Sequence, residues 1–309
     1  MNPLYQQALA GTLASAPTGG MRSLRFWNNL PVDAQLFYLT EDATRCAMGV
    51  VPAGYAVNFW VANGDYISGS CRHTGSFMGL CAITSSTPSL FFGPNFMVAP
   101  NDIGLPPQPT SEVVIPPDSP RVLVAAGLLA NRNRTIREQY WRRLPESYTI
   151  APGETQTVST TSTSNMQQTS SSTDTVSASL GTSASAGWGP MSVGISASLS
   201  ASSTSFQEVS ISTEYTAYVS DTLTATASYT QMFLKWQLMD IVSVLSPDGV
   251  VLSSIVNGLS PTLLQGPYNL SDLSTLGTAK KERRLPSPGF PRTRVAARPF
   301  QPRAVADRG

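Results

Sequence analysis

The residue types that most often carry chemistry are scarce in this chain. Its 309 residues include one histidine, His73, and three cysteines, Cys46, Cys71 and Cys81. These four side chains could form a Cys3His zinc site, but the sequence has no CxxC pair, and we favour structural roles for them. GxSxG, P-loop and HExxH motifs are absent, and no carboxylates cluster for acid–base catalysis. We therefore expect neither enzyme activity nor a metal or other cofactor.

Charged residues are also scarce in this chain. Hydrophobic residues make up 41% of the chain and charged residues only 13%, with a net charge of +1. The chain can therefore bury a core, while Ser and Thr replace much of the usual surface charge. The low net charge argues against nucleic-acid binding through a basic face. No apolar run is long enough for a transmembrane helix, and the first 20 residues do not read as a secretory signal.

Residues 22–98, which follow a short N-terminal lead (1–21), are predicted to form a small antiparallel β-sandwich. Short aromatic and β-branched runs alternate there with turn signals such as Asn63-Gly64-Asp65. The order of three runs resembles the β-sandwich domain of the von Hippel-Lindau type: Phe26-Trp27-Asn28-Asn29, Leu36-Phe37-Tyr38-Leu39 and Val51-Pro52-Ala53-Gly54. Four aromatic residues could bind a receptor or stack on sugars, although aromatics at strand spacing are more often core: Trp27, Phe59, Trp60 and Tyr66.

Residues 99–146 combine a proline-rich connector with a predicted basic helix. Between Arg121 and Leu144, apolar residues recur at roughly helical spacing with five arginines among them, which predicts one helix or two helices broken near Asn131. Such a helix either presents a solvated basic face, which we favour, or approaches anionic lipid headgroups. At the other end of the chain, residues 278–309 are rich in Pro and Arg and are predicted to be a disordered, protease-sensitive tail.

The most regular pattern lies in residues 176–201. From Val176 to Trp188 the even positions are apolar or Thr and the odd positions are Ser or Gly, and after Gly189-Pro190 the phase inverts. Two antiparallel strands joined by a short turn, with Ala186 opposite Met191, would place both apolar sets on one face. We predict that six larger side chains of this face contact lipid: Val176, Leu180, Met191, Val193, Ile195 and Leu199. The indole of Trp188 is predicted to lie at the tip of the hairpin.

The absence of charge makes a bilayer the expected partner of this face. No Asp, Glu, Lys or Arg occurs between Asp174 and Glu208, and a charge at mid-bilayer depth on a barrel wall costs about 2–4 kcal/mol. Strands of about 11 residues match the apolar band of such a wall. A lone hairpin would leave strand edges unpaired in lipid, so insertion requires several copies. The flanking residues 155–175 and 202–231 continue the alternation and are predicted to form long stem strands.

With long Ser/Thr-rich strands on both sides of an amphipathic loop, residues 147–240 resemble the aerolysin-like pore-forming proteins, including the epsilon-toxin and mosquitocidal-toxin group. The elongated domain to which they belong is predicted to span residues 147–277. The resemblance implies a mainly β fold: a small N-terminal β-sandwich head and an elongated antiparallel β domain with an amphipathic insertion hairpin. It implies that residues 176–201 are tucked against the body in the soluble form. It also implies homo-oligomers on a target-cell membrane, reached through lipid and a glycan or protein receptor.

Two further consequences follow from the resemblance. The basic tail becomes a candidate activation peptide, because some relatives carry one at the C-terminus. The protein would be secreted, and the lack of a recognisable secretory signal predicts a non-classical route.

Two other interpretations remain open. A Ser/Thr-rich fibrous or adhesin-like surface protein would explain the composition, and a carbohydrate-binding β module with an assembly arm would explain the aromatic residues. Neither accounts for the phase inversion at Gly189-Pro190. We therefore favour the pore-forming interpretation.

Overall fold

The protein is mainly β, as predicted. The computed structural model describes residues 20–39, 45–87, 90–92, 106, 118–169, 173–181, 188–200 and 215–269. Strands dominate these residues, and two helices, α2 (Thr173–Leu180) and α3 (Trp188–Ser200), account for the described helical part. The predicted tail, 278–309, and most of the N-terminal lead lie outside the described residues.

The N-terminal residues form the expected β-sandwich head. Three strands make one sheet in the order β4-β1-β7: β4 (Ala56–Ala62), β1 (Met21–Asn28) and β7 (Leu90–Phe92). Four strands lie against it: β3 (Arg45–Val51), β2 (Ala34–Leu39), β5 (Tyr66–Cys71) and β6 (Phe77–Ala82). Both layers contribute to one apolar core, in which Phe26 packs edge-on against Phe59 with ring centroids 5.5 Å apart.

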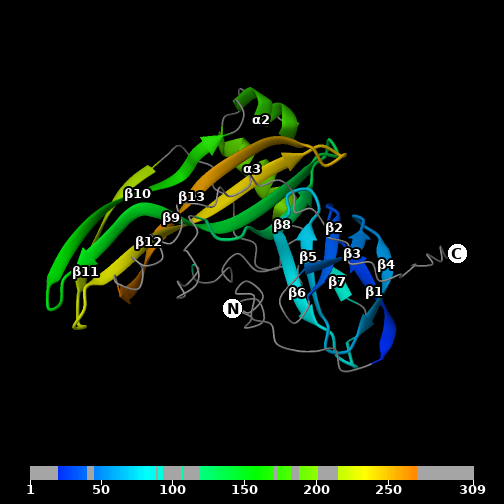
Figure 1. The fold of residues 1–309 in the computed structure, drawn as a ribbon. Coiled ribbons are helices and arrows are strands. Elements are labelled where there is room, and N and C mark those ends of the chain that lie inside the picture. The colour runs from blue at the N-terminus through cyan, green and yellow to red at the C-terminus, as the bar shows by residue number, and fades with distance from the viewer. Residues whose placement is uncertain are drawn as a thin grey trace, which may run out of the picture.

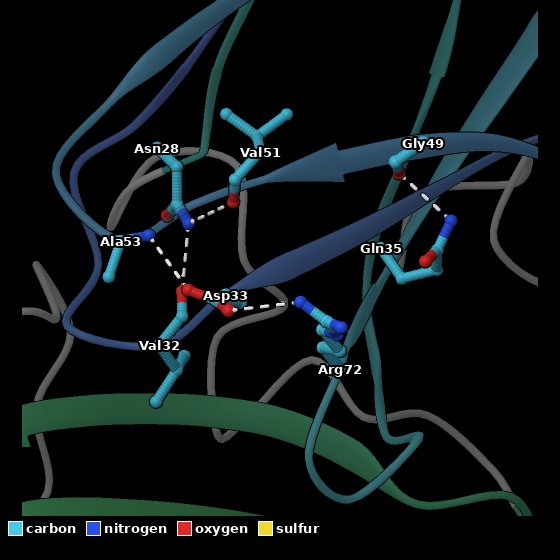
Figure 2. Close-up of polar contacts among 8 residues, drawn as sticks. All are labelled: Asn28, Val32, Asp33, Gln35, Gly49, Val51, Ala53 and Arg72. Atoms are coloured by element: carbon cyan, nitrogen blue, oxygen red, sulfur yellow. Dashed lines mark hydrogen bonds and ion pairs between the residues drawn. The ribbon is translucent and has the colours of Figure 1, made fainter. Parts of the chain in front are cut away.

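The loops of the head are fixed by buried polar groups. The Asn28 side-chain amide donates to the carbonyls of Val32 and Val51, at 2.8 and 2.9 Å (Figure 2). Its Oδ1 accepts from the Leu30 amide. Asp33 accepts from the Ala53 amide (3.0 Å) and pairs with Arg72 (3.6 Å). Two loops, 29–33 and 52–55, are therefore held together beside the body of the protein.

The body consists of long antiparallel strands that extend away from the head (Figure 1). They are arranged in the order β11-β10-β13-β12-β9-β8, and β8 pairs in parallel with β6, so that the head strands β6-β5-β2-β3 complete a ten-stranded sheet. Their bounds are β8 (Val122–Leu128), β9 (Arg134–Ile150), β10 (Thr155–Thr169), β11 (Tyr215–Thr224), β12 (Gln231–Leu245) and β13 (Val251–Asn269).

The predicted helix between Arg121 and Leu144 is wrong, because this segment forms β8 and most of β9. Six consecutive residues of β8 are buried. Leu123 and Ala126 pack in the head core, whereas Ala125 packs with α2 and α3. A strand that is covered on both faces loses the period-two alternation that would have identified it. The turn between the strands contains Arg132 with a φ of 68°.

One of the arginines assigned to a basic helical face is instead buried in the sheet. Arg137 Nε on β9 donates to both carboxylate oxygens of Asp240 on β12, at 2.7 and 2.9 Å. Both side chains are almost fully buried, with 3% and 2% exposed. The pair ties the two central strands of the body together.

We expect Arg137→Met to lower the free energy of unfolding by about 3–5 kcal/mol, since it leaves a buried carboxylate without its partner. The control is Arg72→Met, which removes an ion pair whose arginine is 57% exposed and should cost no more than about 1 kcal/mol. Urea denaturation of both variants measures the difference. Equal losses would contradict a structural role for the buried pair.

Candidate functional site

The described parts of the segment predicted to insert into membranes are helical in this structure, so the predicted β-hairpin of residues 176–201 is wrong there for this form of the protein. Residues 182–187 and 201 lie outside the described residues. Helices α2 and α3 lie on the sheet near the junction of head and body, where α3 contacts β8 and β9 and α2 contacts β12 and β13 (Figure 1). No helix among the described residues is long and apolar enough to span a membrane.

The apolar positions of the segment fit a helix as well as a strand. In a strand, residues two apart lie on the same face, so residues four apart do as well. Residues four apart also lie on the same face of a helix. Val176 and Leu180 have this spacing, as do Met191, Ile195 and Leu199. All five are buried. The sequence analysis used only the period of two and missed this second interpretation.

Val193 separates the two interpretations. It belongs to the predicted lipid face of a hairpin, but in α3 it lies two residues out of step with the buried stripe, and 62% of it is exposed. The side chain of Trp188, the predicted tip residue, lies outside the described part of the structure. The structure therefore brings together five of the seven predicted insertion residues and leaves Val193 facing solvent.

The docked helices are held by apolar packing and neutral hydrogen bonds. Five apolar side chains form a stripe along the two helices: Val176, Leu180, Met191, Ile195 and Leu199. This apolar stripe packs on Ala125, Val242, Val244 and Ile255. The two helices contain one charged residue, Asp174. This docking can therefore be undone without separating buried ions.

Hydrogen bonds from the body fix both helices. The side-chain amides of Asn131 and Asn133 donate to the carbonyl oxygen of Ser179 near the end of α2, at 3.0 and 2.7 Å. The Ser179 hydroxyl lies 2.9 Å from that of Ser253 on β13. On α3, the hydroxyls of Ser198 and Thr135 are 2.6 Å apart.

A glycine allows α3 to approach β8 closely. A Cβ atom on Gly127 would lie 2.0 Å from the carbonyl oxygen of Ser198 and 3.0 Å from the amide nitrogen of Leu199. Only a residue without a side chain permits this backbone contact. The docked position of α3 therefore requires a glycine at position 127.

An open cleft of about 650 Å³ borders the same end of α3. Its walls come from the head loops at Leu30 and Gly54, from Leu128 and Arg134 of the body, and from Ser198. The cleft therefore lies beside the C-terminal turn of α3.

The strands that flank the segment confirm part of the predicted stem, because β10 and β11 pair with each other in an antiparallel ladder. The ladder runs without a register shift from the pair Thr155 and Thr224 to the pair Ser164 and Tyr215, so the two residue numbers of each pair sum to 379. Val158 and Leu223 are buried on one face, whereas Thr155 and Thr224 are exposed. Residues 170–172 and 202–214 of the predicted stem lie outside the described residues, and residues 173–175, also predicted as stem strand, begin α2 instead.

The predicted receptor-binding aromatics are divided between different surfaces. Trp60 is 54% exposed, and the strand register places it on the same outer face of the β1–β4 pair as Trp27. Phe59 points into the head core, and Tyr66 lies on β5 in the other sheet. Sequence reasoning missed Arg25, which stacks over the Trp27 ring at 4.7 Å, although its alternation with Leu24 and Phe26 could have indicated the outer face.

The histidine and cysteines have structural surroundings. The cysteines are free, and burial raises the pKa of the Cys71 and Cys81 thiols. Burial lowers the pKa of His73, Asp33 opposes that shift and Arg134 adds to it. A Cβ on Gly249 would lie 2.1 Å from His73 Nδ1, so the ring packs directly on the β12–β13 turn. Across the described residues, no three or more His, Cys, Asp or Glu side chains form a metal site.

No family model and no curated protein matches this chain. Among solved structures, the chain is similar to that titled "Crystal structure of Cry35Ab1", with a TM-score of 0.34 and 8% sequence identity. The match covers 67% of this chain and 64% of that chain.

We expect Gly127→Ala to loosen the docking of α3, because the added methyl group overlaps the helix backbone and overpacking costs about 1–3 kcal/mol. The matched change Gly194→Ala lies within α3, where a Cβ would meet nothing within 4 Å, and should stabilise the helix by about 0.5–1 kcal/mol. Hydrogen exchange of the α3 amides should become faster in the first variant and slower in the second. Identical exchange in both would contradict the close contact.

Proposed function

We propose that this protein binds a target membrane, oligomerises and inserts the α2–α3 segment as a β-hairpin that contributes to a transmembrane β-barrel pore. The observation that carries the proposal is the double use of one apolar stripe. Five of the side chains that alternate like a lipid-facing strand pair also seal α2 and α3 against the body: Val176, Leu180, Met191, Ile195 and Leu199. The segment is thus suited to a stored helical form and an inserted strand form.

The register of the flanking strands supports the second form. If the β10–β11 ladder continued with the same sum of 379, Leu180 would lie opposite Leu199 and Trp188 opposite Met191. Gly189 and Pro190 would then form the tip. This pairing is shifted by two residues from the one expected for a four-residue turn, but both pairings keep all apolar residues on one side of the ribbon.

The energetics of conversion also support the proposal. Burial of a large apolar side chain contributes about 1.5–3 kcal/mol, so releasing the stripe into water would be costly. Transfer into lipid keeps it away from water, and pairing with neighbouring copies satisfies the strand backbones. Conversion is therefore favourable only where membrane and oligomer are both present.

The position of β11 suits assembly. Among the strands that the structure describes, it is the last on one side of the ten-stranded sheet, next to β10, and such a strand can pair with another chain. We propose that copies associate through this edge, without enzymatic chemistry. Secretion by a non-classical route and activation by removal of the basic tail belong to the same proposal.

The described helices make the fibrous alternative less suitable. A Ser/Thr-rich stalk needs a continuous ribbon, whereas α2 and α3 interrupt the strands between β10 and β11. A carbohydrate-binding role concerns the head and is compatible with pore formation.

Val193→Asp provides a clean test, because this side chain is 62% exposed in the docked helix but would face lipid in the hairpin. We expect an unchanged free energy of unfolding, within about 0.5 kcal/mol, and loss of calcein release from susceptible liposomes, since a charge on the lipid face costs about 2–4 kcal/mol in each copy. Ile195 and Leu199 are less suitable targets, because both are completely buried in the soluble form.

The matched control is Gly194→Asp, one residue further along. Its side chain would face the aqueous lumen, and it has open space in α3, so release should be retained. If both variants released calcein equally, the assigned lipid face would be wrong.

A further inference from the structure

The outer face of the β1–β4 pair exposes an unusual set of side chains. The strand register places Ser23 opposite Trp60, Arg25 opposite Asn58 and Trp27 opposite Ala56. Members of such pairs point to the same side of a sheet. The opposite side is closed, because Leu24 and Phe26 are buried in the head core. We call the polar and aromatic members of the outward-facing set, Ser23, Arg25, Trp27, Asn58 and Trp60, the Trp60 face. Met21 and Ala56 lie on the same side.

The Trp60 face combines a flat apolar platform with polar groups around it. Trp60 is 54% exposed, and Ser23, Arg25 and Asn58 are also exposed. An indole ring offers a broad apolar surface that keeps its shape because it has few rotatable bonds. A pyranose ring has a matching apolar side formed by its C–H groups, with hydroxyls at its rim that hydrogen-bond to amides and alcohols.

The face is positively charged. Strands β1 and β4 contain no Asp or Glu. The Arg25 guanidinium carbon lies 4.7 Å from the centre of the Trp27 ring, and stacking of this kind pre-organises the planar guanidinium for a carboxylate or sulfate. Its neighbour Arg22 is committed elsewhere, since it donates to the carbonyls of Thr84 and Thr87 at 2.6 and 2.9 Å.

We propose that the Trp60 face binds an acidic saccharide, with a sugar ring stacked on Trp60, hydroxyls bonded to Asn58 and Ser23, and the carboxylate or sulfate group held by Arg25. This inference names the receptor class for the head and does not depend on insertion of the α2–α3 segment.

The composition of the face favours a saccharide over a bilayer. Adsorption to anionic lipid uses several basic residues that act together, whereas Arg25 is the single basic residue of the Trp60 face. One stacked ring and one charge-assisted contact give weak, millimolar binding at each site. A multimeric ring of heads would multiply such binding through high effective concentration.

The test is a calorimetric or NMR titration of the soluble full chain with 3′-sialyllactose, 3′-sulfated lactose and lactose. We expect both acidic sugars to bind about tenfold more tightly than lactose, because a hydrogen bond to a charged group is stronger than one to a neutral group. Trp60→Ala should weaken all binding about tenfold through loss of the aromatic platform. Arg25→Gln should remove the preference for the acidic sugars.

The controls are Tyr229→Ala and Arg132→Gln, which change an exposed aromatic and an exposed basic residue outside the Trp60 face and should leave binding unchanged. Absence of preference for the acidic sugars, or binding unaffected by Trp60→Ala, would overturn the proposal. Binding to glycan-free anionic vesicles that is lost in both Trp60→Ala and Arg25→Gln would also overturn it, by identifying lipid as the partner. Because the titration uses no membrane, its outcome is separate from that of the calcein assay.

Discussion

The packing of one apolar stripe against the sheet is the interaction on which the described form depends. Val176, Leu180, Met191, Ile195 and Leu199 fill the space over β8, β12 and β13. Their spacing of four residues makes them one helix face, and the period of two in the surrounding sequence makes them one strand face. A stripe with charged residues could not transfer from the protein into lipid. Apolar residues placed only at the helical period of 3.6 would not lie on one face of a strand pair. The sequence of this segment satisfies both conditions.

The rest of the fold provides the surface that receives this stripe. Strand β8 is buried on both sides, with the head core on one and the helices on the other. The buried pair of Arg137 and Asp240 joins β9 to β12, and Gly127 lets α3 reach the sheet. The contacts of the helices themselves are neutral, such as the asparagine amides bonded to Ser179. Strong interactions thus lie within the sheet and weaker ones at the part proposed to move.

Much of the fold could be predicted from local sequence, and the errors have identifiable physical causes. Alternation and turn residues predicted the head, and the Ser/Thr-rich pattern predicted β10 and β11. The segment containing β8 was mistaken for a helix because burial on both faces removes alternation. The helices were mistaken for strands because the same residues satisfy both periods, and tertiary packing decides between them. Among the head aromatics, the outward direction of Trp60 and the inward direction of Phe59 depend on strand register, which pairing with β1 determines.

The most direct test of the proposed conversion is a reversible covalent lock between α3 and β9. The hydroxyls of Thr135 and Ser198 are 2.6 Å apart, a separation compatible with a disulfide after Thr135→Cys and Ser198→Cys, in a background with Cys46→Ser and Cys81→Ser. The oxidised protein should bind liposomes without releasing calcein, and reduction should restore release, whereas Ser198→Cys alone should be insensitive to oxidation. Equal calcein release by the oxidised and reduced double variant would contradict the account.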